Sequence, residues 1–323
     1  MFTAQTFDVD KDHIEIYTVN IMNLKLYWKQ PLFWNGVIMF FLTLSVIPLL
    51  FLDGRTITGA NAWIKPFKFT VSVLLYSFTT IWILIAFVTN GKQNVRIQWA
   101  LTITSLIEII LIFFQAARGE ASHFNISTPL NQIIFSVMGT SISIFWVFHL
   151  WILYLILKNK SITNVYKEIL GWGLFVSGFG MILGFFMTTP RPEQLEQMKA
   201  GVFLLSGGHN FGGSDGGQGI TFLGWSTEYG DMRIAHFVGM HCMQIFTAIA
   251  AYYHFTGKDN ITMGRIRILG FVSFCITLVL TIQALAGKSL FQWHNVYSVS
   301  LLVLSFVFVL NLIFILLLKG KTV

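Results

Sequence analysis

Eight long apolar segments determine what this chain can fold into. They lie at residues 33–52, 67–88, 96–117, 130–156, 167–187, 233–254, 266–286 and 295–318. A helix needs about 20 apolar residues to cross a bilayer core of about 30 Å, and it satisfies its own backbone hydrogen bonds where no water is available. The sequence therefore predicts an all-α integral membrane protein with about eight transmembrane helices.

The composition agrees with this class. Of 323 residues, 55% are hydrophobic and only 11% are charged, whereas a typical soluble domain is about 25% charged. The net charge of +7 is explained by basic loop ends that meet the lipid bilayer, and no basic tract favours nucleic acid as a partner. The two cysteines, Cys242 and Cys275, lack metal-ligand spacing, which excludes a zinc or iron–sulfur site built on cysteine.

Charged residues predict how the chain is divided and oriented. Segment 1–30 is expected to be cytoplasmic or interfacial, 31–157 to form a first four-helix half, 158–318 a second half, and 319–323 a tail. Thirteen of the 21 Lys and Arg residues would lie on the side of the two termini. Because basic residues are enriched in cytoplasmic loops, both termini are expected in the cytoplasm, with the protein in the cell (inner) membrane.

The longest connection, a glycine-rich loop at 188–232, would then lie on the outer side. Its stretch PEQLEQMKAG predicts a short surface helix that starts at Pro192. The later stretch GGHNFGGSDGGQG leaves two interpretations open. Its backbone amides can hold an anion in a tight nest, or it is a flexible connector.

The two halves match at a fixed shift of 168 residues. The aligned pairs are Gln115 with Gln283, Ala116 with Ala284, Gly119 with Gly287, and Lys65 with Arg233. Four spans in each half would make both halves point the same way across the membrane. The sequence therefore predicts two four-helix repeats of the same orientation. The alternative is that any loop-to-helix junction attracts such polar residues to the membrane interface.

The fifth apolar segment predicts close helix packing. Small residues recur along one of its faces, at Gly173, Ser177, Gly180 and Gly184. Small side chains let a neighbouring membrane helix approach closely.

An ionisable residue, Glu108, lies near the middle of the third segment. At that depth it is costly and indicates a functional site. Glu108 and Gln115 share a helical face that leads toward Arg118 and His123. One interpretation is a route for protons or quinone chemistry, with Glu108, Gln115 and Arg118 as catalytic residues. The other is a protonated Glu108 that is hydrogen-bonded to a neighbouring helix.

Histidines are expected to gather near the outer surface: His123, His209, His236 and His294. Two histidines from different helices can hold a haem iron, and His236 with His294 are the candidate ligands of a b-type haem. Arg233, with Arg118, would then face the haem propionates. Three of these histidines, with or without Asp215 or Asp231, can instead bind zinc.

Several motifs carry a resemblance to known proteins. NAWIKPFKF, RGEASHFN and GGSDGGQGITFLGWSTEYGDMRIAHFVGMH resemble those of an uncharacterised family of multi-pass bacterial membrane proteins. That resemblance covers most of the chain and implies no function. The architecture also resembles that of haem A synthases, which have eight spans in two four-helix halves. His236 and His294 match the haem ligands of that family's second half, whereas Lys65 and Lys68 stand where its first half has a histidine, so at most one haem is implied.

Three functional hypotheses follow, and the sequence leaves open whether the protein is an enzyme. The first is a haem-binding redox or electron-transfer protein with its site near the outer leaflet. The second is a proton-coupled transporter, or a binder of a small anion or lipid, in which Lys65 and Lys68 gather the anion. The third is a metal-dependent enzyme that acts on lipid at the outer face, with His209 and Asp215 among its zinc ligands.

Overall fold

The computed structural model of the chain describes residues 24–88, 91–256, 262–293 and 295–317. Within these ranges, eight helices are long and apolar enough to cross a membrane. They are α2 (Pro31–Leu52), α3 (Ile64–Phe87), α4 (Gly91–Arg118), α5 (Pro129–Lys158), α6 (Asn164–Met187), α8 (Met232–Thr256), α9 (Met263–Leu285) and α10 (Val296–Leu317). The chain is therefore a multi-pass membrane protein, as its apolar segments predict.

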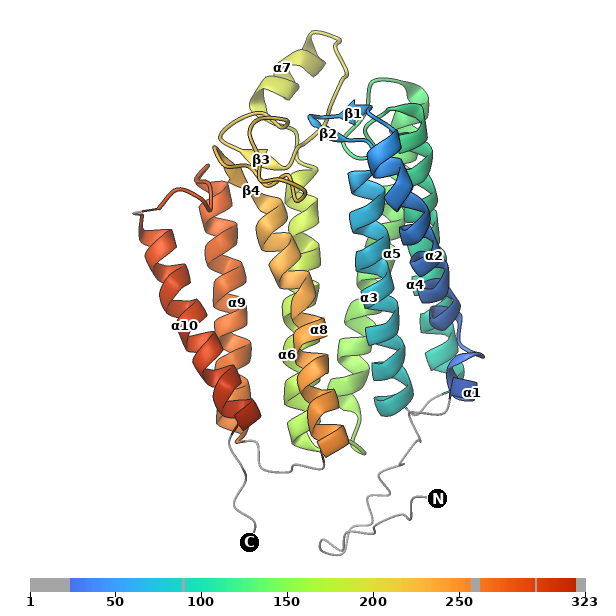
Figure 1. Cartoon of the computed structure of the whole chain (residues 1–323), viewed down its shortest axis with the longest axis vertical. Coiled ribbons are helices and arrows are strands. Elements are labelled where there is room, and N and C mark those ends of the chain that lie inside the picture. Colours follow the sequence, from blue (N-terminus) through green and yellow to red (C-terminus); the bar gives the residue numbers. More distant parts are fainter. Residues whose placement is uncertain (1–23, 89–90, 257–261, 294, 318–323) are drawn as a thin grey trace, which may run out of the picture.

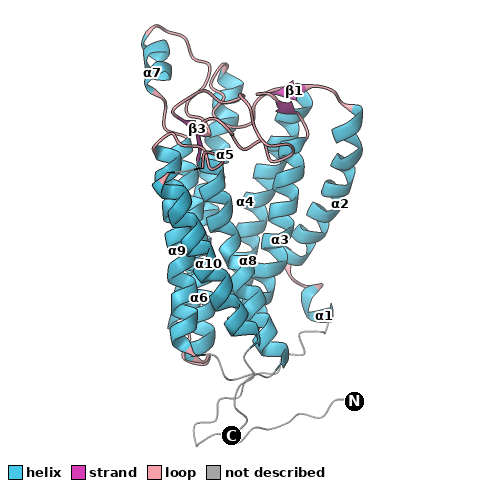
Figure 2. Ribbon diagram, turned by 60° about the vertical axis from the view of Figure 1, so that its left-hand side comes forward, coloured by secondary structure: helices cyan, strands magenta, loops and turns pink. Residues whose placement is uncertain are grey.

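Apart from α1 (Leu24–Tyr27), the shorter elements lie together at one end of the helices (Figure 1). The strands β1 (Thr56–Ile57) and β2 (Ala60–Asn61) pair antiparallel, with Thr56 opposite Asn61. After α7 (Pro192–Lys199), β3 (Asn210–Phe211) pairs antiparallel with β4 (Gly230–Asp231). Figure 2 shows the connecting loops crowded at this end. We call it the capped end and define it by residues 53–63, 119–128, 188–231 and 286–293.

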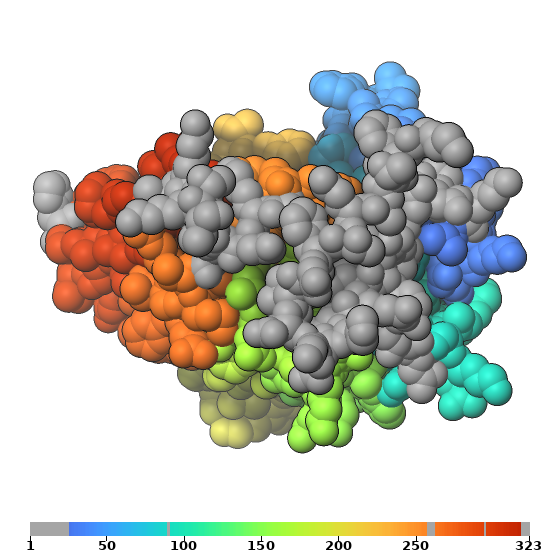
Figure 3. All heavy atoms as spheres, turned by 90° about the horizontal axis from the view of Figure 1, so that it is seen from below, coloured from blue at the N-terminus to red at the C-terminus, as the bar shows by residue number. Residues whose placement is uncertain are grey.

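The contacts between helices follow the same order in two sets of four, and Figure 1 shows α9 and α10 at one side of the molecule and α2 at the other. The first half holds α2 to α5, and the second holds α6, α8, α9 and α10. In each half the first helix packs on the second and third, the second packs on the third, and the third packs on the fourth. The halves meet through α5 against α6 and through α3 against α8. Figure 3, seen from the end opposite the cap, shows the two halves as parts of one elongated cross-section.

One apolar core runs through both halves. It includes Leu84 of α3, Leu101 of α4, Leu174 of α6 and Phe246 of α8, each no more than 1% exposed. Helix faces turned away from this core keep large apolar side chains, such as Phe306 of α10 at 68% exposed. In a bilayer those faces meet lipid tails, which are as apolar as the side chains themselves.

The long loop is folded and makes hydrogen bonds of its own. Its short helix α7 begins at Pro192, as the sequence predicts, with the proline in the first turn. In the glycine-rich part, the side chain of Asp215 accepts hydrogen bonds from the backbone amides of His209 and Asn210. The anion held by the amides of this loop is therefore one of its own carboxylates.

The ends of the helices differ from the predicted boundaries by a few residues. The difference is largest at α4, which begins at Gly91 rather than at residue 96, because the polar residues before the apolar run continue the helix. Helix α5 extends to Lys158, one residue beyond the predicted first half.

Helices α6 and α8 approach each other at glycines. A Cβ atom on Gly180 of α6 would lie 2.6 Å from the carbonyl carbon of Gly239 in α8. A Cβ atom on Gly173 would lie 2.7 Å from the Cβ of Phe246. Both distances are shorter than van der Waals contact. The small face predicted for the fifth segment is therefore confirmed, and its partner is α8.

Gly180→Ala is expected to destabilise the folded protein by about 1–3 kcal/mol, because the backbone of α8 must move to admit the methyl group. Gly139→Ala in α5 is the matched control, since a Cβ there meets nothing within 4 Å, and alanine has the higher helix propensity. Unfolding of the solubilised protein by sodium dodecyl sulfate, followed by circular dichroism, measures both. Unchanged stability of Gly180→Ala would mean that the two helices are not this close.

Helices α4 and α9 end in the same way. Gly119 and Gly287 follow them with φ of +74° and +70°, a left-handed conformation that glycine adopts without strain. A glutamine side chain in the last turn then donates to the carbonyl oxygen six residues on, in the pairs Gln115–Ala121 (3.2 Å) and Gln283–Ser289 (3.0 Å). All four positions obey the shift of 168 residues.

The loop at 188–231 lies over the boundary between the halves. Toward the first half, Lys68 of α3 donates to the carbonyl oxygen of Leu223 at 3.0 Å. Toward the second half, the hydroxyl of Ser289 donates to the carbonyl oxygen of Ser226 at 2.8 Å. The loop therefore holds the capped ends of both halves together.

Candidate functional site

A buried carboxyl–imidazole pair lies beneath the capped end. Glu108 points from the buried face of α4 and is 4% exposed. Its Oε1 lies 3.1 Å from Nε2 of His123, which stands in the loop after α4. The loop turns back over the helix because Gly119 takes its left-handed conformation and Glu120 N donates to Gln115 O. The second oxygen of Glu108 is buried and has no partner in the described part of the chain.

His123 has a partner on each side of its ring. Its Nδ1 lies 3.1 Å from the hydroxyl of Ser122, and its ring packs against Phe69 of α3. Burial and the charge of Lys65 lower the pKa of His123, and the hydrogen bond with Glu108 offsets them only in part. His123 is therefore a neutral imidazole at neutral pH that can accept a proton when its surroundings become more negative.

Lys65, near the start of α3, brings a positive charge beside this pair. Its ammonium lies 5.8 Å from the centre of the Phe69 ring and within electrostatic range of Glu108. Among the residues that the structure describes, no carboxylate forms a salt bridge with it. A lysine that is largely withdrawn from water without a counter-ion is unusual, because burial disfavours an unpaired charge.

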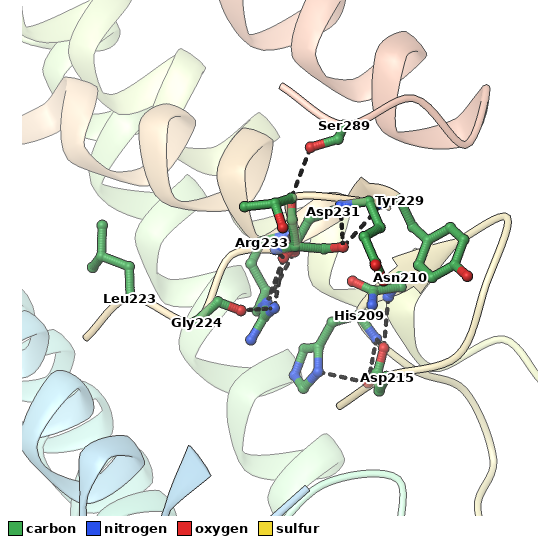
Figure 4. A network of polar contacts seen from close by, with 12 residues as sticks. His209, Asn210, Asp215, Leu223, Gly224, Tyr229, Asp231, Arg233 and Ser289 are labelled. Atoms are coloured by element: carbon green, nitrogen blue, oxygen red, sulfur yellow. Dashed lines mark hydrogen bonds and ion pairs between the residues drawn. The ribbon is translucent and has the colours of Figure 1, made fainter. Parts of the chain in front are cut away.

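Two further cations come from opposite halves. Lys68 of α3 donates to the carbonyl oxygen of Leu223. Arg233 of α8 forms a two-point pair with Asp231 at 2.6 Å and also donates to the carbonyl oxygen of Gly224 (Figure 4). Asp231 is fully buried, so it fixes the guanidinium group in place. Lys68 has no such counter-ion among the described residues.

His209 and Asp215 form a second polar pair in the glycine-rich loop. The His209 Nδ1 atom lies 2.7 Å from Oδ2 of Asp215 (Figure 4). Burial alone would raise the pKa of Asp215, but hydrogen bonds from the His209 side chain and from the amides of His209 and Asn210 lower it below its usual range. Burial lowers the pKa of His209 to about 4 in spite of this hydrogen bond. A neutral His209 then donates from Nδ1 and keeps Nε2 for another partner.

His236 faces the seam between α6 and α8. Its Nδ1 lies 2.7 Å from the carbonyl oxygen of Gly180, so Nδ1 must donate and Nε2 is left for another partner. This arrangement is common for a metal-bound histidine. Its expected haem partner, His294, lies outside the described residues, so the haem pair stays a prediction.

Gln115 and Arg118 lie where the end of α4 meets the start of α5, apart from the other site candidates. Gln115 donates to Asn131 of α5 at 3.0 Å, and Arg118 donates to Gln115 at 2.6 Å and to Asn131 at 3.1 Å. Arg118 also lies over the ring of Phe114. These contacts join the end of α4 to the start of α5.

The remaining candidates form one group, which we call the inter-half cluster. It consists of Lys65, Lys68, Glu108, His123, His209, Asp215, Arg233 and His236. Its members lie within electrostatic range of one another across the two halves, Lys65 with Arg233 and Asp215, and His236 with His123. No three His, Cys, Asp or Glu side chains in the described ranges are placed to hold one metal ion.

Sequence reasoning missed the partner of Arg233. Asp231 and Arg233 stand two residues apart, and the same Asp-X-Arg pattern occurs at Asp53 and Arg55. In both places the backbone amide and the guanidinium of the arginine donate to the same carboxylate. The repeated Asp-X-Arg pattern could have predicted this partner, because the hydrogen bonds form within three consecutive residues and need no tertiary contact.

No family model, curated protein or solved structure matches this chain. The chemistry of the inter-half cluster is therefore the basis for assigning a function.

Proposed function

We propose that this protein binds an anionic small molecule or lipid headgroup between its two halves, and that binding is coupled to protonation of the Glu108–His123 pair. The observation that carries this proposal is Lys65. Its ammonium stands beside the pair, largely withdrawn from water and without a salt-bridge partner in the described structure. An anion that enters the cluster would supply the missing counter-charge.

Charge balance in the cluster supports this choice of ligand. Asp231 offsets Arg233, whereas Lys65 and Lys68 lie within electrostatic range of each other with no such partner. Two like charges repel each other, and an anion bound beside them would attract both and offset that repulsion. Because Lys65 comes from α3 and Arg233 from α8, the anion would contact both halves.

The proton coupling follows from the position of Lys65. Its positive charge, together with burial, lowers the pKa of His123. An anion next to Lys65 offsets that charge and raises the pKa, so His123 takes up a proton when the anion binds. By linkage, a lower pH then strengthens anion binding.

The proposal extends to the internal repeat of the chain and to its orientation in the membrane. We propose that the halves are two repeats of the same orientation with both termini in the cytoplasm, which puts the cluster toward the outer side. The matching order of helix packing and the matching ends of α4 and α9 support the repeat. The excess of basic residues on the side of the termini supports the orientation.

Titration of the full-length protein in phosphatidylcholine nanodiscs tests the proposal. Inorganic phosphate and dihexanoyl phosphatidylglycerol are separate probes, so that a small anion and a lipid headgroup can be told apart. Saturable binding of either probe that depends on Lys65 supports the site. Absence of saturable binding of both probes would contradict it.

A further inference from the structure

The buried face of α4 is polar along most of its membrane span. Its residues Asn94, Gln98, Thr102, Ser105 and Glu108 are each at most 8% exposed. Their spacing of three and four residues places them within an arc of about 120° and along about 21 Å of the helix. A polar row of this length inside a membrane protein is costly and indicates a role beyond packing.

Other helices bond to this row. The amide of Asn35 in α2 donates to the hydroxyls of Ser77 in α3 and Ser105 in α4, each at 3.0 Å. Nearer the end opposite the cap, Gln98 donates to the side chain of Gln30 at 2.6 Å. The row is therefore enclosed by α2, α3 and α4 rather than exposed to lipid.

Three buried oxygen atoms near this row lack a partner within the described ranges. They are Oδ1 of Asn35, Oγ1 of Thr102 and Oε2 of Glu108. An unpaired buried polar atom destabilises a fold, and a water molecule with two to four polar neighbours removes that cost. Ser177, Thr247 and Gln283 of the second half also carry unpartnered oxygen atoms, but around α4 such atoms lie along a buried polar row, which points to water inside the first half.

The second half lacks this row. At the shift of 168 residues, Ile266, Gly270 and Ile276 of α9 replace Gln98, Thr102 and Glu108. The hydroxyl groups of α9 donate to backbone carbonyl oxygens of α9 itself. Thr277, for example, donates to the carbonyl oxygen of Ser273 at 3.0 Å. By contrast, the glutamine in the last turn is present in both halves, as Gln115 in α4 and Gln283 in α9. The polar row is therefore a feature of the first half and not of the shared scaffold.

We propose that the polar face of α4, with Asn35 and Ser77, is a hydrated path that conducts protons between the end opposite the cap and His123. A proton that arrives along α4 binds Oε2 of the Glu108 carboxylate. The carboxyl group then turns this O–H toward His123 and passes the same proton to Nε2, which leaves a carboxylate beside an imidazolium. The imidazolium releases its Nδ1 proton to water at the capped end, where this side chain is 22% exposed. A half-turn of the ring then presents the unprotonated Nδ1 to Glu108, so the next proton enters at Nδ1 and leaves from Nε2, and this step regenerates the starting tautomer.

This activity shares Glu108 and His123 with the anion site but needs no anion. The charged or titratable groups that face the pair are Lys65 from α3 and His236 from α8. The charge of Lys65 favours release of the proton from His123 toward the capped end, because it disfavours a second positive charge beside it.

Proton flux through the reconstituted full-length protein tests the path. Liposomes of phosphatidylcholine and phosphatidylethanolamine would contain the pH dye pyranine, with potassium and valinomycin to clamp the membrane potential. Thr102→Val keeps the side-chain shape and removes only an unpartnered hydroxyl, so the protein should fold. Its flux should fall at least about tenfold, because one step of the path then has no group to hold water. Glu108→Gln should lose flux as well.

Thr277→Val is the matched control, since this hydroxyl is buried but bonds within its own helix, and its flux should equal that of the wild type. A wild-type flux no faster than that of protein-free liposomes would overturn the path. So would wild-type flux in Thr102→Val, or an equal loss in Thr277→Val. Neither phosphate nor phosphatidylglycerol is added in this assay and the path needs no bound anion, so its failure leaves the anion site untouched.

Discussion

Arg233→Met is expected to destabilise the folded protein by about 3–5 kcal/mol, since it leaves a buried carboxylate without its charge partner. The side chain of Asp231 is 0% exposed and lies 2.6 Å from the guanidinium of Arg233. The amide of Ser226 would still donate to it, but Lys68 would act on its charge only at longer range, and no cation in the described residues would form a salt bridge with it. Unfolding of the solubilised protein by sodium dodecyl sulfate measures the loss.

Arg55→Met is the matched control for this prediction. Arg55 pairs with Asp53 in the same Asp-X-Arg geometry and at the same distance of 2.6 Å, but the two side chains are 48% and 20% exposed. Water can solvate an exposed partner, so this pair contributes far less. The double variant Asp231→Asn with Arg233→Met should recover part of the stability, because no unpaired charge remains. Equal losses at the two sites would contradict the burial of Asp231.

Lys65→Met is expected to weaken binding of the anionic probe by about 2 kcal/mol or more, which is roughly thirtyfold in Kd. The reason is that Lys65 lies beside the Glu108–His123 pair and forms no salt bridge with any described residue. The folded protein should be at least as stable as the wild type, because the substitution removes a charge that is largely withdrawn from water. Titration in nanodiscs with phosphate and with dihexanoyl phosphatidylglycerol measures the affinity.

The control is Lys199→Met at the same end of the molecule. Lys199 lies on α7 and is 72% exposed in a surface pair with Glu196, so its loss should leave affinity unchanged. If Lys65→Met and Lys199→Met weakened binding equally, the effect would come from surface charge and not from the cluster.

Much of the fold could be predicted from apolar periodicity alone. Each apolar run of about 20 residues became a helix, since a single segment of this length satisfies its own backbone hydrogen bonds in lipid only as a helix. The start of α7 at Pro192 and the close contact of Gly180 with α8 were likewise local signals. Which helices pack against each other could not be predicted from the sequence, because an apolar helix face carries little information about the neighbour that it contacts.

The site was predictable only in part. Glu108 was conspicuous because a carboxyl group inside a span is rare, and His123 was conspicuous as a polar residue beyond the helix end. Their contact at 3.1 Å depends on the turn at Gly119, which sequence spacing does not determine. The approach of Lys65 to Arg233 depends on the packing of α3 against α8, and therefore on the whole fold.

The polar face of α4 shows a signal that was present but unused. Gln98, Thr102 and Ser105 stand at helical spacing below Glu108 and could have been grouped with it. Each residue alone is unremarkable in a membrane helix, because hydroxyl and amide side chains often join neighbouring helices. Only their burial together, with unpartnered oxygen atoms on Thr102 and Glu108, distinguishes a path from ordinary packing.

The pH dependence of anion binding tests the central claim most directly. The affinity of the nanodisc-embedded protein for its anionic probe should rise as pH falls through the range in which His123 takes up a proton, which lies below the usual range of histidine. In Glu108→Gln the same curve should be shifted to lower pH, because the carboxylate that favours the imidazolium is gone. An affinity that is independent of pH in the wild type, or an unchanged curve in Glu108→Gln, would contradict coupling between the anion site and the Glu108–His123 pair.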